Sequence, residues 1–307
     1  MESTPAQPWP VWRRIGFRFA FVYFLLTFSP LAFLEFIPGA YGLIEVLYAP
    51  IVWLTEWVNK QWLHIADPLV MPNGSGDTSY GWAVMYTYLM LSLVVSIGWS
   101  LFDRKRQSYN QLCYWLCLLL RYTLIMACFA YGIQKVFALQ MPFPNMSQLA
   151  TPLGDFLPMR LSWMFIGYST PYQVFSGVAE VLAALLLLWR RTATLGALVA
   201  FGVMFNVAML NLSYDIPVKI YSIHLCIISA YLLWQDRERL LNFFLLNRPT
   251  IPSTLFAYAF SKKWMRISRV VAKVIFIALG LGMVVVSAIQ YKQQVAAENN
   301  KVLPPIK

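Results

Sequence analysis

Four of the ionisable side chains inside long apolar stretches of this 307-residue sequence could do chemistry. They are Arg121, Lys135, Glu180 and His224. A charged side chain at membrane depth is costly, so it usually faces a polar cavity or an ionic partner. Acidic, basic and imidazole groups are also the ones that transfer protons in enzymes. We therefore take these four residues as candidate catalytic residues.

Position along two consecutive apolar stretches predicts an ion pair between Arg121 and Glu180. Arg121 lies about nine residues, or about 13 Å, inside its stretch, and Glu180 lies at a comparable depth in the next. The alternative is that this pair only locks two helices together. Lys135 follows Arg121 by 14 residues, which returns a helix to within about 40° of the same direction. We expect both side chains, together with Cys117 and Cys128, to share one side of the helix.

A second set of polar residues is expected to bind a ligand. The candidates are Asp155, Asn206, Asn211, Asp215, Lys219 and Tyr221. Most of them lie near His224 in one outer hairpin, over residues 211–224, which predicts a polar pocket open to the outer side. The alternative is a hydrogen-bonded plug that closes the bundle.

Two helix faces combine small and polar residues at helical spacing. One face carries Gln173, Gly177, Glu180 and Ala184, and the other carries Gly202 and Asn206. Such faces favour close helix contact with hydrogen bonding, and they would equally suit a narrow cavity.

Motifs for metals, nucleotides and thiol redox chemistry do not occur. The sequence has no CxxC, HExxH, GxGxxG or Walker loop. Cys113, Cys117 and Cys128 are expected to be small core residues. His64 lies in an outer surface segment, so a haem held by His64 and His224 is not expected. We predict no metal site.

Composition determines the class of protein that must position these residues. Apolar residues make up 59% of the chain, charged residues 12%, and the mean hydropathy is +0.59. These values exclude disorder and an ordinary soluble domain, and only four cysteines in 307 residues exclude a disulfide scaffold. We expect an all-α, polytopic transmembrane bundle in contact with the lipid bilayer, with about seven spans. The spans are predicted at residues 15–37, 80–102, 112–136, 172–189, 192–212, 217–234 and 269–291.

Basic residues determine the orientation. Fifteen Lys and Arg residues precede, open or follow the predicted spans at one side, Arg18 among them in the first turns of the first span, and five lie at the other side. Basic loops face the cytoplasm, so the N-terminus is expected inside and the C-terminus outside. The net charge of +11 then reports topology, and no nucleic-acid partner is expected. The bacterial inner membrane is the expected location.

An apolar segment at Tyr41–Val58 is predicted to lie on the outer leaflet. An eighth span there would invert every later loop. Leu43, Leu47, Ile51 and Val58 would share one helix face, and Pro50 is expected to kink or split the helix. A re-entrant segment is the alternative. We divide the chain into a two-span extension (1–111), a four-helix core (112–235), and a linker with a seventh span (236–307), with a short cytoplasmic helix within 235–268.

The middle of the chain resembles the DoxX-type membrane proteins. The resemblance covers residues 114–234 and rests on Arg121-Tyr122-Thr123-Leu124, Gly132, Lys135 and Glu180, followed by Arg190-Arg191-Thr192. The outer segment Gly74-Ser75-Gly76-Asp77-Thr78 is similar to one in longer bacterial relatives. The resemblance implies a four-helix core in which Arg121, Lys135 and Glu180 line a pocket for a quinone or another small molecule.

Three functions remain open on this basis. The first is a quinone-linked oxidoreductase, or the membrane subunit of one. The second is a non-catalytic partner or assembly subunit of a cell-envelope complex that binds other membrane subunits. The third is a transporter, which intramembrane charges allow but which the absence of an inverted repeat disfavours.

Overall fold

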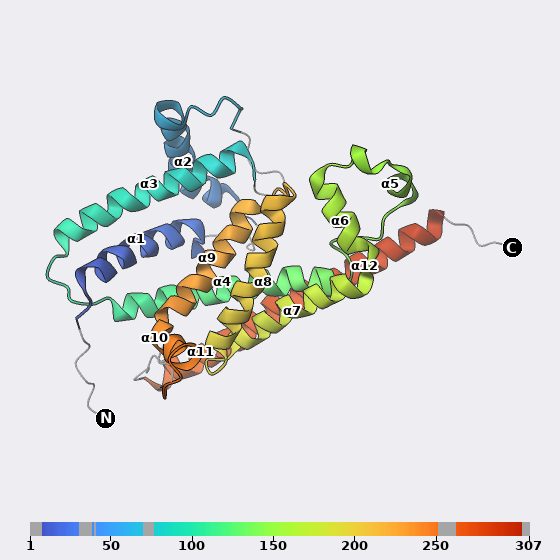
Figure 1. Cartoon of the computed structure of the whole chain (residues 1–307). Helices are drawn as coiled ribbons and strands as arrows, with labels where there is room; N and C mark the ends of the chain where they lie inside the picture. Colours follow the sequence, from blue (N-terminus) through green and yellow to red (C-terminus); the bar gives the residue numbers. More distant parts are fainter. Residues whose placement is uncertain (1–7, 31–38, 40, 70–76, 251–261, 303–307) are drawn as a thin grey trace. The chain divides into compact units, whose positions relative to one another are not determined.

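The computed structural model describes residues 8–30, 39, 41–69, 77–250 and 262–302, and these residues form helices without a strand (Figure 1). The prediction of an all-α protein is confirmed. The elements are α1 (Val11–Thr27), α2 (Tyr41–Val58), η2 (Asn59–Leu63), α3 (Ser79–Phe102), α4 (Asn110–Val136), α5 (Met146–Ala150), η3 (Leu153–Asp155), α6 (Pro158–Tyr168), α7 (Thr170–Leu188), α8 (Ala193–Ser213), α9 (Lys219–Gln235), α10 (Arg237–Phe244), α11 (Lys263–Ile275), η4 (Phe276–Leu281) and α12 (Gly282–Val302).

Five helical stretches in the described residues are long and apolar enough to cross a bilayer. They are α3, α4, α7, α8 and the stretch Lys263–Ala297 formed by α11, η4 and most of α12. The chain is therefore an integral, multi-pass membrane protein in contact with lipid. The other two predicted spans correspond to α1 and α9, which have 17 residues each and fall short of the roughly 20 that a span needs. Residues 31–37 of the first predicted span lie outside the described residues.

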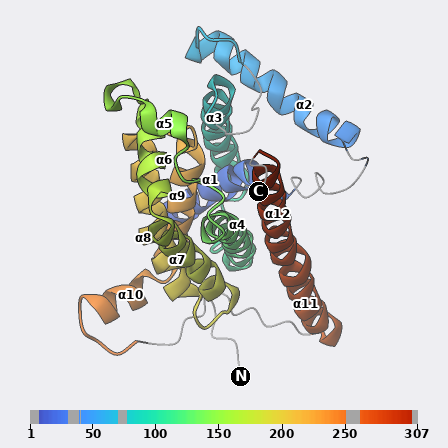
Figure 2. The same cartoon turned by 90° about the vertical axis from the view of Figure 1, so that its right-hand side faces the viewer.

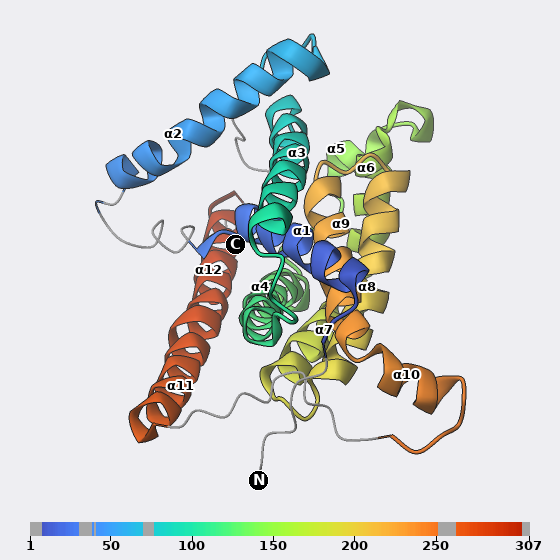
Figure 3. The ribbon, with the colours of Figure 1, turned by 90° about the vertical axis from the view of Figure 1, so that its left-hand side faces the viewer.

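The segment before α3 forms one helix with the predicted bounds. Helix α2 runs from Tyr41 to Val58 with Pro50 in its interior, so the proline does not split it. Glu45 and Glu56 are exposed, whereas Thr55 and Val58 are buried. Figure 3 shows α2 crossing α3 rather than lying along it. A position on the outer leaflet stays a prediction.

The chain divides into two compact units. The first contains residues 1–120 and the short segment Pro217–Tyr221. Its centre is the contact between α1 and α3, where Phe17, Phe24 and Ala83 are buried. Tyr109, in the loop that joins α3 to α4, stacks on Phe17 with ring centroids 5.4 Å apart. This contact fixes one end of the loop against α1.

The second unit contains residues 121–216 and 222–307. Helices α7 and α8 pack as a hairpin, and a Cβ on Gly196 of α8 would lie 2.7 Å from the backbone nitrogen of Leu187. Only glycine permits this distance, so the hairpin is closed by backbone contact. Figure 2 shows α11 and α12 as one continuous rod.

Helix α10 confirms the short helix predicted within 235–268, and its cytoplasmic location stays a prediction. The division into 1–111, 112–235 and 236–307 also stays a prediction.

Candidate functional site

The polar centre of the second unit is an ion pair between Lys135 of α4 and Glu180 of α7. The Lys135 ammonium donates a hydrogen bond to Glu180 Oε1, and both residues are buried. The second carboxylate oxygen, Oε2, is also buried, and none of the described residues donates to it. A carboxylate oxygen without a donor is unfavourable in an apolar interior, so Oε2 is an acceptor available to a ligand.

Glycine residues hold α4 and α7 close enough for this pair to form. A Cβ on Gly177 would lie 2.6 Å from the carbonyl oxygen of Gly132, and a Cβ on Gly132 would lie 2.8 Å from Val181 Cγ2. The two backbones therefore touch at this crossing, as in small-residue contacts between membrane helices. The face of α7 that carries Gln173, Gly177, Glu180 and Ala184 is buried, which confirms the predicted close helix contact.

The predicted ion pair between Arg121 and Glu180 is wrong. Arg121 donates from Nε to the carbonyl of Leu187, at 2.5 Å, and from Nη2 to the carbonyl of Leu188, at 2.8 Å. The glycine crossing places Glu180 at the level of Gly132, which is eleven residues from Arg121, or about 16 Å along α4. Arg121 and Lys135 do face the same neighbour, α7, as their spacing predicts.

Arg121 and Lys273 meet at the C-terminal end of α7. Lys273 of α11 donates to the carbonyl of Leu188 at 2.7 Å and lies over the ring of Trp189 at 5.2 Å. The last carbonyls of a helix have no partner within the helix, and cations near them are favourable. These two side chains therefore cap α7 and tie α11 to it. A lysine near the end of a span is expected to extend to the membrane surface. Lys273 instead donates to the end of α7.

The polar residues of the outer hairpin separate into buried and exposed groups. Asn211 donates to Ser222 Oγ at 3.0 Å, and both are buried, as is His224. By contrast, the structure does not bury three of the predicted ligand-binding residues: Asp155, Asn206 and Asp215. Asn206 and Gly202 lie on the exposed face of α8, because the packed face of that helix carries Gly196, Ala200, Met204 and Asn211. Asp155 and Asn206 therefore stay outside the buried group of Asn211, Ser222 and His224, and Asp215 is an exposed residue just after α8.

Lys219 and Tyr221 belong to the first unit, where the Asp77 carboxylate binds the start of α9. The Asp77 carboxylate accepts the backbone N–H of Lys219 at 2.6 Å and of Ile220 at 3.0 Å, and Lys219 Nζ lies 4.0 Å from it. Asp77 therefore caps the first turn of α9 from a residue 142 positions away. Tyr221 is partly exposed. No local pattern connects Asp77 with α9, since a capping residue normally adjoins its helix.

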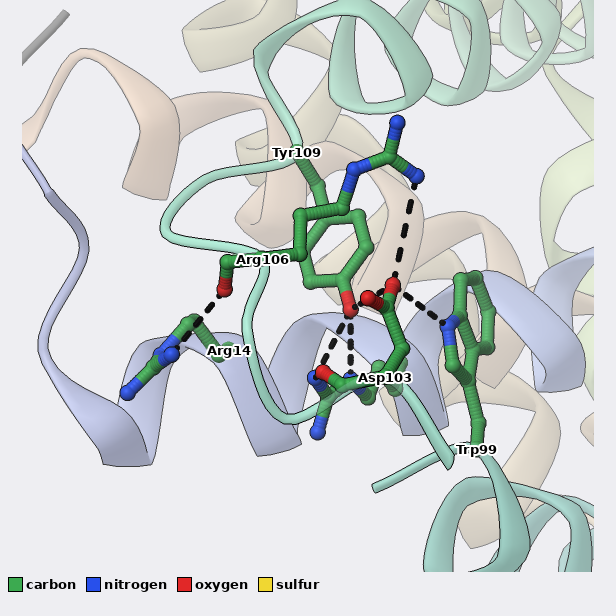
Figure 4. A network of polar contacts seen from close by, with 6 residues as sticks. Arg14, Trp99, Asp103, Arg106 and Tyr109 are labelled. Carbon is green, nitrogen blue, oxygen red and sulfur yellow. Dashed lines mark hydrogen bonds and ion pairs between the residues drawn. The ribbon is translucent and has the colours of Figure 1, made fainter. Parts of the chain in front are cut away.

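A buried arginine network joins α1 to the loop between α3 and α4 (Figure 4). Arg18 donates to the Tyr109 hydroxyl from Nε and Nη2, at 2.9 and 2.7 Å, to Ser100 Oγ at 2.7 Å, and to the Asp103 carbonyl at 2.7 Å. Tyr109 donates in turn to Asp103 Oδ2 at 2.9 Å. This hydrogen bond holds the pKa of the Asp103 carboxyl below its usual range, and burial raises the pKa of the Tyr109 hydroxyl.

Sequence reasoning counted Arg18 among the loop cations, yet it is buried within α1. Seven residues separate it from the start of the helix, and Phe17 and Phe19 flank it. An arginine flanked by aromatic residues inside a helix was the available signal. Cys113, Cys117 and Cys128 are buried, as predicted, and none of the described cysteines forms a disulfide. The described residues contain no group of three His, Cys, Asp or Glu able to hold a metal ion.

Comparison with known proteins identifies a bacterial relative. YwoB, an uncharacterized protein of Bacillus subtilis, is 36% identical to the chain over 117 residues, which are 38% of this chain and 73% of YwoB. The chain belongs to the YwoB family. No family model and no solved structure matches the chain. YwoB is uncharacterized, so its name indicates no activity for comparison with the site.

Gly177→Ala is expected to destabilise this YwoB relative by about 1–3 kcal/mol, because the new methyl group would meet backbone atoms of α4. The free energy of unfolding in detergent measures the effect. Gly202→Ala is the matched control in α8, since a Cβ there meets nothing within 4 Å. The control should be neutral or gain up to about 1 kcal/mol from helix propensity. Equal effects of the two substitutions would contradict the close crossing.

Proposed function

We propose that the protein acts in quinone-linked redox chemistry at the bacterial inner membrane, as an oxidoreductase or as the membrane subunit of one. The observation that carries the proposal is the Lys135–Glu180 pair, which offers a cationic donor and an unoccupied carboxylate acceptor side by side in an apolar helix pair. The resemblance of Arg121, Gly132, Lys135 and Glu180 to the DoxX-type pattern supports the same reading.

The two side chains fit the polar groups of a quinone or quinol. A bound quinone would supply exchange of two electrons and two protons. Glu180 Oε2 would accept the hydrogen bond of a quinol hydroxyl, and the carboxylate would take up its proton. Lys135 would donate to a carbonyl oxygen of the quinone beside its ion pair with Glu180. Arg121 would act at a distance from this chemistry, by holding the end of α7 in place through Leu187 and Leu188.

The proposed topology has seven spans, with the N-terminus inside and the C-terminus outside. Helices α1 and α9 would then complete the five longer helices as shorter spans. The excess of basic residues on one side of the predicted spans supports this arrangement.

A quinol-binding measurement tests the function. Glu180→Gln removes a charged acceptor whose hydrogen bond contributes about 1.5–3 kcal/mol, so affinity for a short-chain quinol should fall about 10- to 100-fold. Quenching of tryptophan fluorescence in detergent reports the binding. Asp155→Asn, which changes an exposed carboxylate, is the matched control and should bind as the wild type does. Lys135→Gln/Glu180→Gln, which leaves no unpaired charge, should also lose affinity. A quinol affinity unchanged in both Glu180 variants would exclude the proposal.

An assembly subunit is the second candidate, and the exposed apolar helices favour it. Leu93, Val94 and Ile97 of α3 are all more than half exposed, as are Val270 and Val274 of α11. Lipid covers such faces, and so would the helices of a partner subunit. Crosslinking in membranes distinguishes the two. Recovery of the chain always alone would count against the assembly role.

A further inference from the structure

One end of the first unit carries a dense group of positive charge, which we name the α1–loop basic cluster. It consists of Arg13, Arg14 and Arg18 of α1 and of Arg104, Lys105 and Arg106 in the loop between α3 and α4. Hydrogen bonds join the two segments: the N–H of Trp9 donates to the Gln107 carbonyl at 2.9 Å, and Arg14 Nη1 donates to the Arg106 carbonyl at 3.0 Å. Figure 4 shows Arg14 beside this part of the loop.

The guanidinium groups of this cluster are positioned by aromatic rings. Arg13 lies over the ring of Trp9 at 4.2 Å, and Arg106 lies over the ring of Tyr109 at 5.4 Å. Trp9 and Tyr109 are themselves buried. Cations stacked on buried rings lose much of the freedom of ordinary surface arginines. The guanidinium groups therefore form a site of fixed geometry, which a general excess of mobile surface charge would not.

The cluster lacks the anions that would neutralise it. Asp103 is its one carboxylate among the described residues, and Asp103 Oδ2 already accepts from Tyr109 at 2.9 Å and from Trp99 Nε1 at 3.4 Å. Arg106 Nη1 lies 3.9 Å from the same oxygen, and the hydrogen bonds of Arg18 go to neutral oxygens. Arg14 Nε is buried and no described residue accepts from it. An external anion would complete the hydrogen bonding of this site.

Exposed apolar side chains lie at the same helix ends. Trp12 of α1 is 59% exposed, and Leu101 and Phe102 at the end of α3 are 56% and 93% exposed. Aromatic residues next to basic residues are typical of the boundary between lipid and water. A ligand of this site would therefore present an anionic group to the arginines and apolar chains to these residues.

We propose that the α1–loop basic cluster binds the headgroup of an anionic phospholipid. The two non-bridging oxygens of a phosphodiester share one negative charge and match the paired N–H groups of Arg14 and Arg106. The acyl chains would extend along Trp12, Leu101 and Phe102. The site is separate from the Lys135–Glu180 pair and does not depend on the proposed quinone function.

Native mass spectrometry of the detergent-solubilised protein tests the proposal with added phosphatidylglycerol, phosphatidylcholine or inorganic phosphate. The wild type should retain phosphatidylglycerol in preference to phosphatidylcholine, and phosphate alone should not displace it. Arg14→Gln/Arg106→Gln should weaken retention about 30-fold, since each basic residue contributes about fivefold near an anionic lipid. Arg190→Gln/Arg191→Gln removes the same charge from an exposed turn in the other unit and should retain the lipid.

A lysine variant separates a built site from general attraction. Arg14→Lys/Arg106→Lys keeps the charge but loses the forked donors, so retention should fall about fivefold. Thermal unfolding of each variant checks that the Arg18 network is intact. Full retention in the lysine variant, equal losses in the two glutamine variants, displacement by free phosphate, or equal binding of phosphatidylcholine would each overturn the proposal.

Discussion

Lys135→Met is expected to lower the free energy of unfolding by about 3–5 kcal/mol, because it leaves the buried Glu180 carboxylate without its only described donor. The carboxylate cannot reach water without moving α7 away from α4, and the crossing at Gly132 and Gly177 resists that movement. Unfolding in mixed detergent micelles, followed by circular dichroism, measures the loss.

Two further variants show whether the loss comes from the broken pair. Lys135→Met/Glu180→Leu removes both charges and should recover most of the stability, since replacing a buried ion pair with apolar residues is often neutral. Lys292→Met, which removes an exposed lysine that lies over the ring of Phe137, should change stability little. A double variant as unstable as the sum of its two singles would show that the charges are not coupled. Recovery of stability without recovery of quinol binding would assign the pair to function.

Arg18→Met is expected to destabilise the protein by about 3–5 kcal/mol. The substitution removes every hydrogen bond from the guanidinium to Tyr109, Ser100 and the Asp103 carbonyl, and leaves buried oxygens without donors. The loop between α3 and α4 would lose its attachment to α1. Thermal unfolding in detergent reports the stability, and proteolysis within residues 103–109 reports the loop.

Arg13→Met is the matched control for Arg18. It removes an arginine from the same helix, but Arg13 is partly exposed and its described contact is with the ring of Trp9. We expect a loss of about 0.5–1 kcal/mol and no new cleavage in the loop. Similar losses from the two substitutions would contradict the buried network.

The two arginines illustrate the limit of counting charges along the sequence. Arg13 and Arg18 both lie at the start of the first apolar run, and their positions along the sequence predict that both mark topology. Burial distinguishes them, because the helix turns Arg18 toward Tyr109 and leaves Arg13 near the surface. Which of two nearby arginines is buried depends on the element that packs against the helix, and that element is more than 80 residues away.

The sequence by itself determined the class of the protein and the positions of most of its long apolar helices. The segment Tyr41–Val58 and the apolar runs that became α3, α4, α7 and α8 were predicted to within a few residues. Their length and apolar content are local properties, because burial of apolar side chains and helical hydrogen bonds act within one segment. The sequence also indicated that Arg121 and Lys135 share a side of α4, which follows from helical periodicity alone.

Only the tertiary structure decided which residues pair. Depth along a helix is counted from its ends, and an error of a few residues moves a side chain by more than the reach of an ion pair. The backbone contact of Gly132 with Gly177 sets the register of α4 against α7. In this register Lys135 pairs with Glu180, and Arg121 binds the carbonyls at the C-terminal end of α7. The cap that Asp77 forms on α9 likewise depends on the packing of segments far apart in the sequence. Contacts between distant segments depend on how whole helix faces fit, and no single segment records that fit.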